Sequence, residues 1–357
     1  MWLVQAAKPR RAGSEIAVTD KEETHIMSHA TRRVRQGLGA AAVAAAAAGI
    51  AVSSAGAAAA SPEGTVVIDT AQLIVTGTDH ADRITLRVPA ADTSVLQVDF
   101  GDDGTVEHTV NRADFGQIQV NSLAGDDVVR IDYGAEVQPF TIVDTGAGDD
   151  TAFGGSGAEL FRTGDGDDVV DGNRGADTAL LGDGADAFSW DPGDGSDVIE
   201  GGRGKDTMVF NGSGGAEKFA ATANGPRLRF TRDVGNIVMD TDDVERVALS
   251  ALGGADTVTV GDLSGTDVRR VDIDLGAQLG GTGGDGAVDA VTVQGTAGRD
   301  VVRVSGSDGD VRIQGLKAKV TISNAEPADQ LTVDTLAGND DVDAGRLTPG
   351  TITFSVL

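Results

Sequence analysis

The chain has 357 residues, a formal net charge of −28 at pH 7 and no cysteine. The absence of cysteine excludes a disulfide framework and cysteine-ligated zinc sites. The excess of negative charge disfavours binding to nucleic acid or anionic membranes and favours binding of divalent cations. With 51 Gly and only 4% aromatic residues, the sequence suits thin coils or sandwiches of small and β-branched side chains rather than a thick core.

Residues 1–60 are predicted to be an N-terminal leader. They hold 7 basic and 4 acidic residues, which leaves 21 basic and 52 acidic residues, and a net charge of −31, for the rest of the chain. Acidic residues within 1–26 do not suit a secretory signal, so this part is interpreted as an upstream extension. Residues 27–60 start at Met27 with three arginines and continue as an uncharged Ala-rich run, which is typical of a signal peptide. That run is also long enough to span a membrane, so an uncleaved anchor is the alternative.

Residues 61–140 are predicted to form an N-terminal all-β region. Short runs of alternating apolar and polar residues are separated by Asp/Gly turns, as in other all-β modules. Asp82 and Asp127 each stand two positions before an apolar residue. They have no neighbouring copy of the same pattern, so we interpret them as the beginnings of strands rather than as metal ligands.

Residues 141–212 contain a nine-residue pattern that occurs seven times from Thr145 onward, with a two-residue insertion at Trp190-Asp191. Position six is acidic and position eight is apolar in every copy. Glycines at positions two and four allow the positive φ and close backbone approach of a tight turn, and the residues after the acid form a minimal strand. Such a strict period indicates a repeat architecture. The acids are Asp150, Glu159, Asp168, Asp177, Asp186, Asp197 and Asp206.

Each copy is predicted to be half a turn of a flattened coil, so that acids eighteen residues apart stack at roughly 4.8 Å. One edge then carries Asp150, Asp168, Asp186 and Asp206, and the other carries Glu159, Asp177 and Asp197. Carboxylates this close repel by roughly 0.8 kcal/mol per pair even in bulk water, so a cation is expected between them. Ca²⁺ fits because it accepts six to eight oxygen ligands in flexible geometry. A metal-free Gly/Asp-rich linker is the alternative, but it has no reason to keep position eight apolar.

This segment resembles the RTX, or haemolysin-type, calcium-binding nonapeptide family, with the repeat G-G-x-G-x-D-x-U-x. The resemblance covers about one fifth of the chain and implies a parallel β-roll, several Ca²⁺ ions held between successive turns, and folding that depends on calcium. The sequence departs from the repeat at Glu159, in place of Asp, and at Asn173, in place of Gly. Beside the seven acids, the resemblance implies that the site includes Gly146, Gly148, Gly164, Gly166, Gly182 and Gly184.

Residues 213–357 are predicted to form a C-terminal all-β region, either a larger β-helix or a sandwich. The segments 253–260, 295–304 and 336–344 repeat a Gly-Asp turn followed by a strand, about 40 residues apart. Asp300 and Asp340 begin such strands but have no acidic partner eighteen residues away, so we expect neither to bind calcium. The region is similar to the β-rich flanks of secreted bacterial calcium-binding proteins.

Motifs of the enzymes that often carry such repeats are absent from the sequence. It has neither H-E-x-x-H nor G-x-S-x-G, so the chain is predicted not to be an enzyme. The predicted function is that of a secreted, extracellular bacterial protein that binds calcium ions, does not bind nucleic acid and has no membrane insertion of its mature chain. The alternatives are a cell-surface adhesion or carbohydrate-binding protein that uses calcium only as scaffold, and a hydrolase with an unfamiliar site.

Overall fold

The computed structural model describes residues 64–357, so the leader predicted over 1–60, with its signal peptide and its anchor alternative, lies outside the described residues. Regular structure in 64–357 consists of strands and of two short 3-10 helices, η1 (Arg112–Asp114) and η2 (Val234–Asn236). Among these residues no helix has the length and apolar character needed to cross a membrane. The fold is all-β, as the sequence predicts.

The strands form two sheets of fourteen strands each. The first sheet, here called sheet A, contains in spatial order β1 (Thr65–Asp69), β2 (Gln72–Thr76), β6 (Gln117–Asn121), β8 (Phe140–Asp144), β10 (Glu159–Asp165), β12 (Thr178–Gly184), β14 (Val198–Gly204), β18 (Ile237–Asp242), β17 (Arg227–Arg232), β16 (Lys218–Asn224), β20 (Thr257–Val260), β22 (Ala290–Gln294), β26 (Gln330–Asp334) and β28 (Thr353–Val356). The second, sheet B, contains β27 (Asp341–Leu347), β23 (Val301–Ser307), β24 (Asp310–Gln314), β25 (Lys319–Ser323), β21 (Arg270–Asp274), β19 (Arg246–Ser250), β15 (Thr207–Asn211), β13 (Ala187–Trp190), β11 (Val169–Asp171), β9 (Thr151–Phe153), β7 (Val128–Asp132), β3 (Arg83–Arg87), β4 (Val95–Phe100) and β5 (His108–Asn111).

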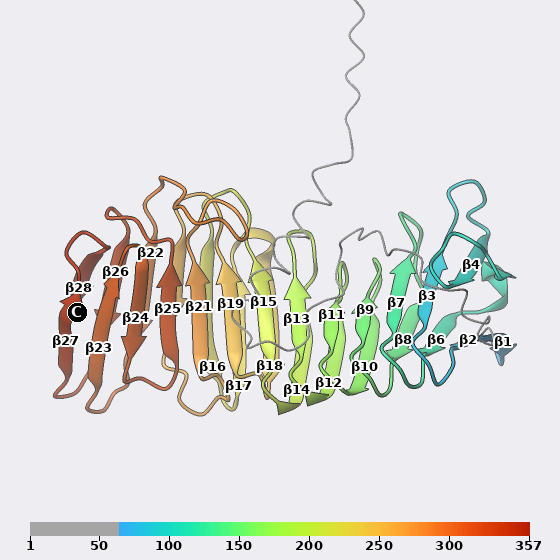
Figure 1. Cartoon of the computed structure of the whole chain (residues 1–357), viewed down its shortest axis with the longest axis horizontal. Coiled ribbons are helices and arrows are strands. Elements are labelled where there is room, and N and C mark those ends of the chain that lie inside the picture. The colour runs from blue at the N-terminus through green and yellow to red at the C-terminus, as the bar shows by residue number, and fades with distance from the viewer. Residues whose placement is uncertain (1–63) are drawn as a thin grey trace, which may run out of the picture.

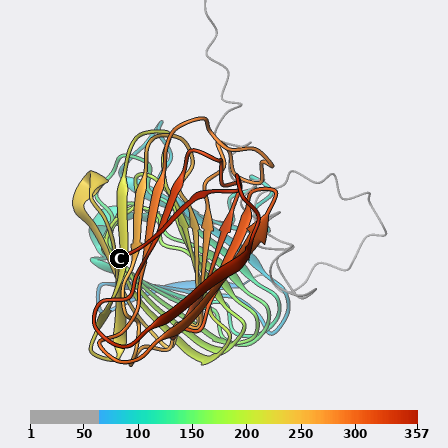
Figure 2. The same ribbon diagram turned by 90° about the vertical axis from the view of Figure 1, so that its left-hand side faces the viewer.

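The chain passes alternately from one sheet to the other and so winds into a two-sided parallel coil. Successive coils lie side by side along one long axis (Figure 1), and the view along that axis shows the two sheets facing each other (Figure 2). Within the nonapeptides the register is the one that the period predicts: Phe161 pairs with Ala179 and Val170 with Phe188. Each eighteen-residue step is therefore one full coil.

Four antiparallel insertions interrupt the parallel pattern. They are the β1–β2 pair, the β3–β4–β5 meander, the β16–β17–β18 meander and the β23–β24–β25 meander. Each insertion extends a sheet by extra strands before the coil resumes, so both sheets run without a break from the N-terminal region through the nonapeptides into the C-terminal region. The flanking regions thus belong to the same coil as the nonapeptides.

The core lies between the two sheets and is built from alternate residues of each strand. Typical strands bury their second and fourth residues and leave the others partly exposed, as in β2, β6 and β22, because successive side chains point to opposite faces. Aromatic side chains gather in the core at the end of the nonapeptide segment, where the rings of Trp190 and Phe210 stack at 4.1 Å and Phe230 packs on Phe210 at 4.8 Å. Trp190, in the two-residue insertion, is fully buried.

Candidate metal centre

The seven nonapeptide acids lie where the coil turns from one sheet to the other. The turns that lead from sheet A into sheet B form the first edge, and those that lead from sheet B into sheet A form the second edge. All seven side chains are at most 2% exposed. The first edge carries Asp150, Asp168, Asp186 and Asp206, and the second edge carries Glu159, Asp177 and Asp197, as the eighteen-residue spacing predicts.

One carboxylate oxygen of these acids links each coil to the coil before it. On the first edge the backbone N–H of Asp150 donates to Oδ1 of Asp168 at 2.8 Å, and the N–H of Asp168 donates to Oδ1 of Asp186 at 2.8 Å. On the second edge the N–H of Asp177 donates to Oδ1 of Asp197 at 2.9 Å. The result is a ladder in which each acid supports the turn of its neighbour.

The second carboxylate oxygen is what makes these acids unusual. In six of the seven, Oδ2 is buried and has no hydrogen-bond partner within residues 64–357. A buried polar atom without a partner costs roughly 1–3 kcal/mol, and more when it is charged. The six are Asp150, Asp168, Asp177, Asp186, Asp197 and Asp206.

Burial also shifts the ionisation of these acids. It raises the pKa of Asp168 from 3.8 to about 6 and that of Asp186 to about 8, with neighbouring carboxylates adding to the effect. Burial likewise raises the pKa of Asp177 above its ordinary range. An ionised ladder is therefore unstable unless positive charge is supplied close to Oδ2.

The donor set fits a calcium ion. Stacked, buried carboxylate oxygens without partners are hard ligands, and Ca²⁺ accepts six to eight of them without strict geometry, whereas Mg²⁺ requires a near-ideal octahedron. The residues that would hold such ions are the six acids with an unpartnered Oδ2.

The turn glycines are required because neighbouring coils approach closely. Gly164 and Gly182 have φ of +99° and +109°, and a Cβ added to either would collide with the backbone carbonyl of the glycine one coil earlier, Gly146 or Gly164. A Cβ at Gly166 or Gly184 would likewise collide with the preceding carbonyl. The predicted site glycines, Gly146, Gly148, Gly164, Gly166, Gly182 and Gly184, thus stack in two columns along the first edge.

Glu159 differs from the other six acids. Its Oε2 accepts the N–H of Gly155 at 3.1 Å, and its Oε1 accepts from the amide of Gln138. Both oxygens are therefore satisfied by the protein itself. These two partners remove the need for a cation at this position.

The first edge is longer than the sequence pattern indicates. The N–H of Asp82 donates to Oδ1 of Asp127 at 2.7 Å, and the N–H of Asp127 donates to Oδ1 of Asp150 at 2.8 Å. Asp82 and Asp127 do precede strands, β3 and β7, as the sequence predicts, but the interpretation that they are isolated is wrong because both belong to the ladder. At the other end, the N–H of Asp206 donates to Glu245 at 2.8 Å, so neither Asp150 nor Asp206 ends the edge.

The second edge also continues, through Glu217, Asp256, Asp289 and Asp329. Among all these additional acids, Asp127, Asp256 and Asp289 have a buried Oδ2 without a partner within the described residues. In the sequence each of them follows a short Gly-containing turn and stands two positions before a buried valine. The sequence around each acid therefore carries a local signal, but the separation of these acids along the sequence does not reveal which of them pair.

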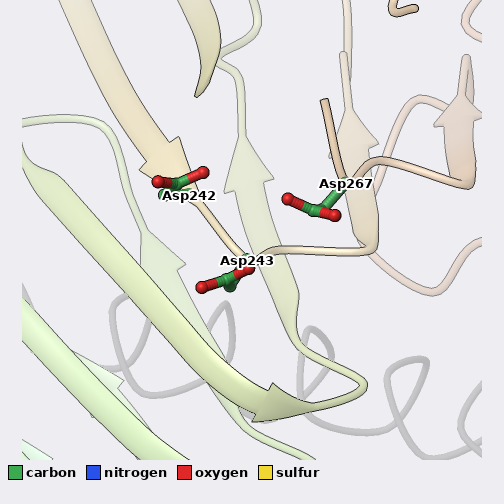
Figure 3. A group of neighbouring side chains, drawn as sticks. All are labelled: Asp242, Asp243 and Asp267. Carbon is green, nitrogen blue, oxygen red and sulfur yellow. The ribbon is translucent and has the colours of Figure 1, made fainter. Parts of the chain in front are cut away.

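Three further acids meet on the surface beside the first edge. Carboxylate oxygens of Asp242, Asp243 and Asp267 lie within 4.8 Å of one another. Asp242 ends β18, Asp243 follows it, and Asp267 comes from the loop before β21 (Figure 3). Asp242 is paired with Arg227 at 3.3 Å and Asp243 is exposed, so solvent and one guanidinium already compensate this group.

Comparison with known proteins assigns no family to this chain. No protein-family model matches the chain, and no curated protein sequence matches it. Among solved structures, the extracellular lipase LipA from Serratia marcescens matches over 56% of this chain and 43% of the lipase chain, with 12% sequence identity and a TM-score of 0.15. A TM-score this low carries no argument about fold or function. The matched part is also less than half of the lipase.

Proposed function

We propose that this chain is a secreted, non-enzymatic, RTX-type calcium-binding protein whose nonapeptide coils fold around Ca²⁺. The observation that carries the proposal is the column of buried Oδ2 atoms without partners on both edges of the nonapeptide segment. Such a column is unfavourable in the metal-free protein and becomes favourable when divalent cations bind it.

Within this function each residue type has its own task. Oδ2 of acids such as Asp168 and Asp186 binds the cation, while Oδ1 keeps the neighbouring turn in place through the backbone N–H. The turn glycines allow the coils to approach closely enough for acids of neighbouring coils to share an ion. Bound calcium supplies the positive charge that the ladder lacks.

Calcium titration of the chain tests this proposal. In chelator we expect amide hydrogens of residues 145–212 to exchange rapidly, and in millimolar calcium we expect them to be protected, with a matching gain of β signal in circular dichroism. Extracellular calcium modules bind with Kd of about 10⁻⁴–10⁻³ M, and calcium at ten times Kd adds roughly 1.4 kcal/mol per site. Equal exchange of this segment with and without calcium would refute the proposal.

Export is tested by N-terminal sequencing of protein recovered from the culture medium. We expect the mature chain to begin between Ala58 and Ser61, as the small residues before a signal cleavage site predict. Intact protein in the membrane fraction would favour the uncleaved anchor.

A second candidate function, ligand binding on the calcium-built scaffold, is favoured by a groove on the outer face of sheet B. The groove has a volume of about 530 Å³ and is lined by residues of β19, β21, β24 and β25. Arg246 and Arg270 both pair with Asp272 at 2.7 Å, while Arg312 and Lys319 add two further cations. The lining also includes Asp274 and Asp310 and the hydroxyl groups of Ser250, Thr321 and Ser323. Four cations against three acids, together with hydroxyl groups, suit a saccharide that carries acidic groups.

Binding to an array of acidic and neutral glycans, with and without chelator, separates the two candidates. If the groove binds a ligand, the exchange of Arg312 and Lys319 for Ala removes an acidic-glycan signal, whereas the exchange of the exposed Arg229 on sheet A does not. A chain that takes up calcium but binds no glycan under either condition supports the first candidate alone.

A further inference from the structure

The second edge contains a pair of acids outside the nonapeptides with the same unpartnered oxygens. Asp256 precedes β20 and Asp289 precedes β22, and the N–H of Asp256 donates to Oδ1 of Asp289 at 2.8 Å. Both side chains are 1% exposed, and neither Oδ2 has a hydrogen-bond partner in the described part of the chain. Two buried carboxylate oxygens therefore lie on neighbouring coils without compensation.

A second row of acids lies beside this pair. Oδ2 of Asp285 accepts the N–H of Gly254 at 2.6 Å, and Oε2 of Glu326 accepts the N–H of Gly286 at 2.7 Å. The nonapeptides have the same outer row, in which the N–H of Asp167 donates to Oδ1 of Asp149 at 2.9 Å. The C-terminal edge thus repeats the inner and outer acids of the nonapeptide edge, although the acids are 33 residues apart rather than eighteen.

The acids on either side of the pair are satisfied by the protein. Glu217 accepts from Ser213 and from Nε of Arg232, the latter at 2.6 Å. Oδ2 of Asp329 accepts the N–H of Glu326 at 2.7 Å. Between Glu217 and Asp329, the unsatisfied oxygens of the second edge are therefore those of Asp256 and Asp289, a pair that suits one shared cation.

The charges around the pair are of one sign. The carboxylates of Glu217, Asp285 and Glu326 all act on Asp256 or Asp289, in addition to their effect on each other. The guanidinium of Arg232, which lies at the Glu217 end of this stretch, is engaged by Glu217. Carboxylates that are buried close together require a nearby cation to remain ionised.

We propose that Asp256 and Asp289 form a separate calcium site in the C-terminal half of the chain, with Asp285 as a neighbouring carboxylate that adds negative charge. It uses the same chemistry as the proposed function but stands on different residues, in coils that lack the nonapeptide. The ligand is a hard divalent cation because every donor named is a carboxylate oxygen, and Ca²⁺ is favoured over Mg²⁺ because it does not require an ideal octahedron.

The experiment counts bound calcium by equilibrium dialysis on four forms of the full chain. The first is the unmodified chain, and the second is D256N/D289N. Asn keeps the oxygen that accepts the backbone N–H and removes the charged oxygen that binds metal. The third, D168N/D186N, lowers nonapeptide binding. The fourth, D308N/D310N, removes two exposed acids of the same half and serves as the charge-matched control.

We expect D256N/D289N to bind about one calcium ion fewer per chain than the unmodified chain, since one ion shared by two acids is lost. The same loss is expected when these substitutions are added to D168N/D186N. The control should bind as many ions as the unmodified chain. Unchanged stoichiometry in a folded D256N/D289N chain would overturn the proposal.

Two further measurements cover the cases in which the double variant does not fold or the nonapeptides bind no calcium. If D256N/D289N does not fold, the single variant D285N is measured, and it should weaken calcium binding at the C-terminal site; unchanged affinity there would also overturn the proposal. Failure of the nonapeptide function gives a different result: D168N/D186N would then bind as much calcium as the unmodified chain, while D256N/D289N would still lose its ion.

Discussion

Asp168 allows the balance between burial and calcium binding to be measured at one residue. Its side chain is 1% exposed, Oδ1 holds the N–H of Asp150 at 2.8 Å, and Oδ2 has no partner among the described residues. Replacement by Asn keeps the first interaction and removes the charge. The variant therefore imitates the protonated acid at every pH.

The magnitude follows from the pKa of Asp168, which burial raises from 3.8 to about 6. A group whose pKa is raised on folding stabilises the fold while it is protonated, and that stabilisation is lost as the pH rises through the folded-state pKa. At pH 7 the loss for Asp168 amounts to about 3 kcal/mol in the calcium-free chain. Asp168→Asn should regain up to this amount without calcium, and should lose the stabilisation that calcium gives the unmodified chain.

Urea unfolding at pH 7, followed by circular dichroism in chelator and in millimolar calcium, measures both effects. We expect the variant to be more stable than the unmodified chain in chelator and to respond less to calcium. Asp165→Asn, at an exposed acid three residues away, is the control and should change neither quantity by more than about 0.5 kcal/mol. A variant that is less stable in chelator and equally responsive to calcium would refute the reasoning.

Three further predictions concern the same edges. Gly164→Ala should destabilise the chain by at least about 3 kcal/mol, because the new Cβ meets the carbonyl of Gly146 at a positive φ. Gly134 also has a positive φ but has open space around it, so Gly134→Ala should cost only about 1 kcal/mol in the same urea unfolding experiment. In chelator the free energy of unfolding should fall as the pH rises from 5 to 8, since burial raises the pKa of Asp150 to about 6 and that of Asp127 to about 7; a rise over this range would contradict the prediction. Asp300→Ala should leave calcium stoichiometry unchanged in dialysis but destabilise the fold by about 1–3 kcal/mol, because Oδ2 of Asp300 accepts the N–H of Thr296 at 2.7 Å.

The nonapeptide part of the fold could be predicted from the sequence because its period is short and strict. A constant eighteen-residue step places Phe161 on Ala179 and Asp168 on Asp186, and the structure has both pairs. The two-residue insertion at Trp190 changes the step to twenty residues without changing which acids pair, as Asp186 with Asp206 shows.

The flanks could not be predicted to the same depth because their steps vary. Asp82 and Asp127 pair across 45 residues because the antiparallel strands β4 and β5 lie between them. Asp289 and Asp329 pair across 40 residues, with the β23–β24–β25 meander inserted. An inserted hairpin leaves the coil intact in space but destroys the sequence period, so these acids looked isolated.

The acids of the two edges fall into two kinds, and under the proposed function their order along the coil makes calcium dependence local. Acids such as Asp168 and Asp289 have an unpartnered oxygen, whereas acids such as Asp82, Glu217 and Asp300 have theirs satisfied by a turn N–H four residues earlier. A coil with a satisfied acid is complete without metal. Under the proposed function, a coil with an unpartnered oxygen is completed by a cation.

The coil that contains Glu217 separates the nonapeptides from the C-terminal pair. Its carboxylate is held by Arg232, whose guanidinium also lies 5.2 Å from the Trp190 ring, and the same coil carries Phe219 and Phe230 of the aromatic core. Its buried aromatic side chains add hydrophobic stabilisation that does not depend on a bound cation. We therefore expect this coil to be stable without metal. Under the proposed function it provides a fixed surface on which the calcium-dependent coils of either side order independently.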